Sequence, residues 1–161
     1  MPAQWPRRPN RTWWTKPLFG RLTPEGCIFS AIPWRTGAVA RIQGDLKDRS
    51  FKLALTVLQL ADQLPNNVKG WVLGKQLIRA GTSIGANVRE ADNAHTDADF
   101  AYKCSLARKE AGETHYWLEL CIAAGLLTGA ATEEAIQEAD QLARITSAIV
   151  RTTQDHIARS S

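Results

Sequence analysis

The sequence predicts an all-α protein: an antiparallel up-down four-helix bundle with a largely disordered N-terminal extension. Beyond residue 45, apolar residues recur at three- and four-residue steps in four long segments, as on one face of an α-helix. Short stretches rich in Pro, Asn and Gly separate these segments, and none of them alternates with the period of a strand. Long amphipathic helices with short connections favour an up-down bundle over residues 45–161.

The first two helices are expected at about 49–64 and 68–93. Pro65 and the Asn66-Asn67 pair end the first one. The second contains glycines, each of which costs about 1 kcal/mol relative to Ala, so we expect its small residues to let a neighbouring backbone approach closely. These are Ala80, Gly81, Gly85 and Ala86. The apolar stripe of the first helix is Leu53, Val57, Leu60 and Leu64, widened by Leu58 and Ala61. That of the second is Leu73, Leu77, Ala80, Ile84, Val88 and Ala91.

The third and fourth helices are expected at about 97–124 and 133–158. Thr96 and Thr132 are suitable N-caps, and Gly125 suits the position after the third helix. The stripe of the third helix is Phe100, Cys104, Ala107, Ala111, Thr114, Leu118 and Cys121. That of the fourth is Ile136, Ala139, Leu142, Thr146, Ile149, Thr153 and Ile157, with Ala143 and Val150 beside it. Cys104 and Cys121 are therefore expected to be small buried apolar residues of a reducing cytoplasm.

Residues 1–44 have a different character, with six of the seven prolines and four of the six tryptophans. Prolines so closely spaced interrupt any helix. Two interpretations remain open for this extension. Its interleaved Arg and Trp suit stacking on bases and neutralising phosphates, or the segment is a non-folding extension without a role.

Charge divides at the same place. Residues 1–50 hold nine Lys and Arg against three acids, whereas residues 51–161 hold eleven against thirteen. The helical part is thus a balanced, solvated surface rather than a dedicated polyanion binder. No apolar run approaches the length of a membrane span, so we expect a cytoplasmic protein without a membrane partner.

No constellation of residues supports catalysis or a cofactor. The run Gly81-Thr82-Ser83-Ile84-Gly85 matches the nucleophile elbow of hydrolases, but it lies within a helical pattern instead of following a strand. The three histidines have no metal-ligand spacing, and no Glu-x-x-His step of a di-iron bundle occurs. We therefore expect a non-enzymatic protein with no catalytic residue, metal or cofactor.

Two runs resemble the signature of the four-helix-bundle family of the 23S rRNA intervening-sequence protein. They are residues 74–91, GKQLIRAGTSIGANVREA, and residues 103–120, KCSLARKEAGETHYWLEL. The resemblance covers about residues 46–155. One departure is Gly112, where a longer residue is usual. The family is similar to the accessory variability determinant of diversity-generating retroelements. The resemblance implies a ring-like homopentamer without catalytic activity, associated with RNA or DNA or with a nucleic-acid enzyme such as a reverse transcriptase.

The motif residues have two interpretations. As architecture, they form a polar network that sets helix register and the subunit interface, since polar groups on a packed seam must be hydrogen-bonded. This structural set is Gln76, Gly81, Ser83, Gly85, Asn87, Glu90, Glu110, Glu113 and Trp117, with Arg79 and Lys109 completing the network. As a nucleic-acid site, the phosphate contacts are Lys75, Arg79, Arg89, Lys103, Arg108 and Lys109. Trp71 and Trp117 are expected to pack or to lie in an interface.

Two functions follow as hypotheses. The first is an oligomeric module that binds nucleic acid weakly and electrostatically. The alternative is a structural oligomer or protein adaptor that binds no nucleic acid.

Overall fold

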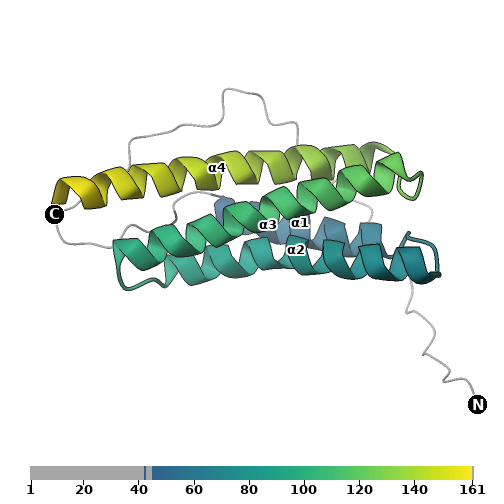
Figure 1. The fold of residues 1–161 in the computed structure, drawn as a ribbon, viewed down its shortest axis with the longest axis horizontal. Coiled ribbons are helices and arrows are strands. Elements are labelled where there is room, and N and C mark those ends of the chain that lie inside the picture. The colour runs from purple at the N-terminus through teal and green to yellow at the C-terminus, as the bar shows by residue number, and fades with distance from the viewer. Residues whose placement is uncertain (1–41, 43–44, 161) are drawn as a thin grey trace, which may run out of the picture. The chain divides into compact units, whose positions relative to one another are not determined.

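The computed structural model describes Ile42 and residues 45–160, and these form four α-helices. The helices are α1 (Leu46–Ala61), α2 (Val68–Asp92), α3 (Asp97–Ala123) and α4 (Ala130–Ser160). Successive helices run in opposite directions, with α2 and α4 on either side of α3 (Figure 1). The predicted all-α antiparallel bundle is confirmed. The extension predicted to be disordered lies outside the described residues, except for Ile42, whose N–H donates to Asp92 Oδ1 at 3.2 Å.

The first helix begins and ends three residues before the predicted bounds. Its first turn is helical because Leu46 is buried and forms part of the core. After Ala61 the chain tightens, since the N–H groups of Gln63 and Leu64 donate to carbonyls three residues back, at 3.0 and 3.2 Å. Pro65 explains this early end, because a proline disfavours helical geometry at the residue before it.

The fourth helix corrects one predicted cap. It begins at Ala130 and continues to Ser160, so Thr132 lies inside its first turn. The Thr132 side chain is buried, and its hydroxyl donates to the Thr128 carbonyl at 3.4 Å. The other two signals are confirmed, since the Thr96 hydroxyl accepts from the Asp99 N–H at 3.1 Å and Gly125 follows α3 with a φ of +66°.

The core forms where the apolar stripes of the four helices meet. All seven residues predicted for the α3 stripe are buried. Leu58 is an error in the α1 stripe, because 41% of it is exposed. Burial raises the pKa of the Cys104 thiol to about 12 and also raises that of Cys121. Both cysteines therefore behave as the small buried residues predicted, whereas Cys27 lies outside the described residues.

Small residues of α2 allow α1 to pack closely against it, as predicted, but only those on the side of α2 that faces α1 contribute. A Cβ added to Gly81 would lie 2.8 Å from Val57 Cγ2, and one added to Gly85 would lie 3.6 Å from Ser50 Oγ. Gly81 and Gly85 are buried in this α1–α2 contact. Ala86 was wrongly included, because it is exposed.

An ion pair joins α1 to α4, its less extensive contact. Arg49 Nε lies 2.8 Å from Glu138 Oε1, and Arg49 Nη2 donates to Gln141 Oε1 at 2.7 Å. The Arg49 side chain is 10% exposed, so this pair is largely removed from water. An arginine placed near the start of a helix gives no sign in the sequence that its partners lie about 90 residues away.

Candidate functional site

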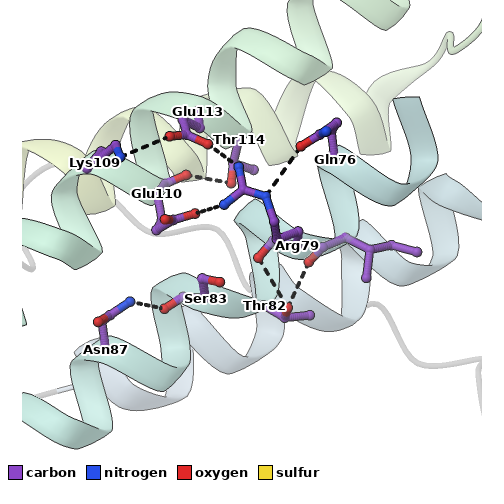
Figure 2. Close-up of polar contacts among 10 residues, drawn as sticks. Gln76, Arg79, Thr82, Ser83, Asn87, Lys109, Glu110, Glu113 and Thr114 are labelled. Atoms are coloured by element: carbon purple, nitrogen blue, oxygen red, sulfur yellow. Dashed lines mark hydrogen bonds and ion pairs between the residues drawn. The ribbon is translucent and has the colours of Figure 1, made fainter. Parts of the chain in front are cut away.

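Arg79 is the centre of a polar cluster on the seam between α2 and α3. Its guanidinium donates to Glu110 Oε2 at 3.3 Å, to Glu113 Oε2, and to Gln76 Oε1 at 3.3 Å. Figure 2 shows the two glutamates reaching down from α3 to the guanidinium, with Gln76 beside it on α2. The predicted polar network between the second and third helices is therefore present in this cluster.

Helical spacing places these groups. Gln76 and Arg79 are three residues apart on α2, and Glu110 and Glu113 are three apart on α3, so each pair shares one side of its helix. The hydrogen bond to Glu113 raises the pKa of Arg79, which stays charged. Because 49% of the Arg79 side chain is exposed, the ion pairs contribute little stability and mainly fix geometry.

Ser83 and Asn87 do not join this network. The Asn87 amide donates to the Ser83 backbone carbonyl at 2.8 Å, one turn earlier in the same helix (Figure 2). The Ser83 hydroxyl makes no hydrogen bond with another described residue. Both side chains are only half-buried, so water can satisfy them. Their predicted part in a link between the two helices was wrong.

Three more of the six predicted phosphate contacts are occupied within the chain. Lys103 Nζ lies 2.6 Å from Glu90 Oε2, and this bond raises the pKa of Lys103. Lys109 Nζ lies 3.7 Å from Glu113 Oε1. Arg89 donates to the Gly85 carbonyl at 3.2 Å and lies 5.5 Å from the centre of the Phe51 ring. Arg79, Lys103 and Lys109 thus form ion pairs with glutamates, whereas Arg89 contacts a carbonyl and an aromatic ring.

Lys75 and Arg108 differ from the other four. Both are exposed, and neither forms an ion pair with any residue that the structure describes. Lys75 lies on α2, one residue before Gln76 of the Arg79 cluster. Arg108 lies on α3 and faces α4. The structure thus does not bring the six predicted cations together into one surface.

The two tryptophans have different surroundings. Trp117 packs against the core, and its ring lies 4.9 Å from that of Tyr116 in an edge-to-face arrangement. Its buried indole N–H has no hydrogen-bond partner among the described residues. Trp71 is 77% exposed, so it does not pack within the described part of the chain, and of its two predicted roles only an interface position stays a prediction.

The chemistry of this seam is that of charge pairing. The run Gly81 to Gly85 lies inside α2, which rules out the strand-turn geometry of a nucleophile elbow. Across Ile42 and residues 45–160, His, Cys, Asp and Glu nowhere gather in threes that could hold a metal ion. In the same part of the chain, no helix is both long and apolar enough to cross a membrane.

The motif-based prediction missed Arg144 and Arg151 of α4, which face Arg108. Both lie outside the two runs that carry the resemblance. One signal could have found them, because a spacing of seven residues places two side chains on the same side of a helix. The sequence alone does not say that this side of α4 is next to Arg108.

Comparison with known proteins finds a family and similar solved structures. Residues 44–148 match the model of the family described as 23S rRNA-intervening sequence protein. Among solved structures, the chain is similar to a protein of unknown function from the S23 ribosomal protein family of Bacteroides thetaiotaomicron VPI-5482. The two are 40% identical, with a TM-score of 0.61, over 65% of this chain and 97% of that one. No curated protein matches the chain.

Proposed function

The chain belongs to the family of 23S rRNA-intervening sequence proteins, and we propose that it is a non-enzymatic, oligomeric module that binds RNA or DNA weakly and electrostatically. The observation that carries this proposal is Arg108, the motif arginine whose charge is exposed and unpaired within the described residues. The ribosomal names of the family and of its solved relative agree with a nucleic-acid partner.

Oligomerisation is part of the proposal because one bundle has little free positive charge. A ring of copies repeats each exposed cation, and several weak contacts with one polymer act together through effective concentration. The association of copies, as a homopentamer or another closed ring, is inferred from the resemblance of the two motif runs. Exposed apolar side chains at the start of α2, namely Val68, Trp71 and Val72, are suited to contacts between copies.

The same apolar side chains favour a second candidate, a protein adaptor that binds no nucleic acid. Trp71 and Val68 are 77% and 80% exposed, and large exposed apolar groups often mark interaction sites. On this alternative the bundle would join protein partners, and its cations would serve solubility alone.

Salt-dependent binding separates the two candidates. Light scattering gives the mass of the full chain and of a fragment of residues 45–161, and the affinities of both for RNA and DNA are then measured at two salt concentrations. We expect an oligomer whose affinity falls steeply with salt, because each neutralised phosphate releases counterions. An oligomer that binds neither polymer at low salt would favour the adaptor. Binding by the full chain alone would assign it to residues 1–44.

A further inference from the structure

A hollow of about 490 Å³ lies on the surface between α3 and α4. Three arginines line it, Arg108 from α3 and Arg144 and Arg151 from α4, together with the small residues Ala143, Ser147 and Ala148. We propose that this hollow, the arginine groove, binds the sugar–phosphate backbone of a nucleic acid. The proposal rests on the function proposed above and names the surface that performs it.

The spacing of the arginines suits a run of phosphates. Arg144 and Arg151 are seven residues apart on one helix, which corresponds to about 10 Å along its axis. A strand advances about 3.4 Å per nucleotide along a duplex axis, so about three nucleotides cover that distance. Arg108 reaches the same space from the opposite wall. The groove therefore offers cations along a line, as an extended polyanion requires.

The positive charge of the groove is available to a ligand. Arg108 and Arg151 make no ion pair or hydrogen bond with another residue in the described part of the chain. Arg144 Nε lies 2.8 Å from Asp140 Oδ2, one turn away, but 79% of its side chain is exposed. An ion pair so open to water is weak, and a phosphate can take the place of the carboxylate.

The residues between the arginines leave room for a backbone. Ala143 and Ala148, which line the hollow, have short side chains. The Ser147 hydroxyl makes no hydrogen bond with another described residue, so it is free to donate to a phosphate oxygen. The guanidinium groups, each able to bind a phosphate with two hydrogen bonds, therefore lie beside small side chains that leave space for a nucleic-acid backbone.

The exposure of the arginines favours a polymer over a single small anion. A site for free phosphate needs several donors converging within a desolvated pocket, because exposed ion pairs are individually weak. Here the cations lie apart along an open hollow, and their contributions add only when one molecule touches all of them. A polynucleotide meets that condition.

The test compares two doubly substituted full-length chains that lose the same charge. Arg144→Gln/Arg151→Gln removes two cations from the groove, and Lys52→Gln/Lys69→Gln removes two exposed cations from α1 and α2. Circular dichroism and melting curves check that both remain folded. Affinities for a single-stranded RNA and a DNA duplex are measured from about 50 to about 200 mM salt. A competition with inorganic phosphate at constant ionic strength completes the set.

We expect the groove variant to lose about ten-fold in affinity at low salt, with the negative slope of log K against log salt becoming smaller in magnitude by about 1.4–1.8, and the control to stay close to the wild type. Inorganic phosphate should not displace the RNA. Displacement would overturn the backbone assignment in favour of a small-anion site. If both variants bound equally and binding by the wild type still depended on salt, the assignment to the arginine groove would be wrong but the proposed function would stand. A wild type that binds neither polymer at low salt would overturn the proposed function as well.

Discussion

The positively charged side chains on the two sides of α3 have different surroundings. On the side facing α2, Arg79 lies between Glu110 and Glu113, and Lys103 is bound to Glu90. On the side facing α4, Arg108 lies across from two more arginines and from alanine and serine side chains. The first side is a paired seam that joins helices, whereas the second presents charge to solvent.

This difference shows that the surroundings of a motif residue decide its role more than its type does. Arg79 and Arg108 both belong to the runs that resemble the family signature, and both are phosphate contacts in the nucleic-acid interpretation of those runs. Glutamates that share one side of α3 bind the Arg79 guanidinium, whereas the short side chains of α4 leave Arg108 open to solvent. A count of bases and acids along residues 51–161 gives near balance and hides this separation.

The largest effect is expected from a substitution at Gly81, which is buried in the contact between α1 and α2. Leucine there would place its Cβ 2.8 Å from Val57 Cγ2, within the packed contact of α1 and α2. We expect Gly81→Leu to lower the free energy of unfolding by about 1–3 kcal/mol, despite its better helix propensity. Urea denaturation measures the change. Unchanged stability would mean that α1 does not pack against this position.

Gly112 provides the matched substitution on the open side. A Cβ there meets nothing within 4 Å, so Gly112→Ala gains helix propensity without a clash. We expect the free energy of unfolding to rise by about 1 kcal/mol. A loss of stability, measured at the same protein concentration, would indicate that another molecule or copy covers this position.

Removing acids from the paired seam between α2 and α3 should make its positive charge available to a ligand, as it is on the side facing α4. The double substitution Glu110→Gln/Glu113→Gln frees Arg79 and Lys109 from their partners. We expect the affinity for RNA at low salt to rise about five-fold, with a steeper salt dependence, because two more cations can neutralise phosphates. Titration of the wild type and the variant side by side measures this. An unchanged affinity would mean that the seam is not next to the bound polymer.

The smallest effect is expected from removing residues 1–44. A fragment that begins at Asp45 loses the hydrogen bond from Ile42 to Asp92 and the packing of Ile42 on the core. We expect it to keep its helical circular dichroism and to lose about 1 kcal/mol of stability at most. A fragment that no longer unfolds cooperatively would show that the extension belongs to the folded unit.

Local signals were enough to predict much of the fold. The three- and four-residue apolar period located all four helices and the complete inner stripe of α3, because burial on one face imposes that period. Thr96 and Gly125 marked helix ends through side-chain capping and left-handed backbone geometry. Errors occurred where tertiary packing overrides a local signal, as at Leu46, which extends α1, and at Thr132, which is buried inside α4.

The candidate site was harder to predict, for a physical reason. The Arg79 cluster could be anticipated because its members share sides of two consecutive helices. The buried pair of Arg49 with Glu138, and the arginine groove, join residues that are distant in sequence. Periodicity places a residue on one side of its own helix, but it does not say which side of another helix lies opposite.

A direct comparison of the two sides of α3 tests the central claim most directly. The quantity is the slope of log K against log salt for RNA binding by two double variants, Arg79→Gln/Lys103→Gln and Arg144→Gln/Arg151→Gln. Since the first pair is already bound to glutamates, we predict a slope close to that of the wild type for that variant and a slope smaller in magnitude by about 1.4–1.8 for the second. The reverse order would contradict the account, because it would assign the polyanion to the paired seam.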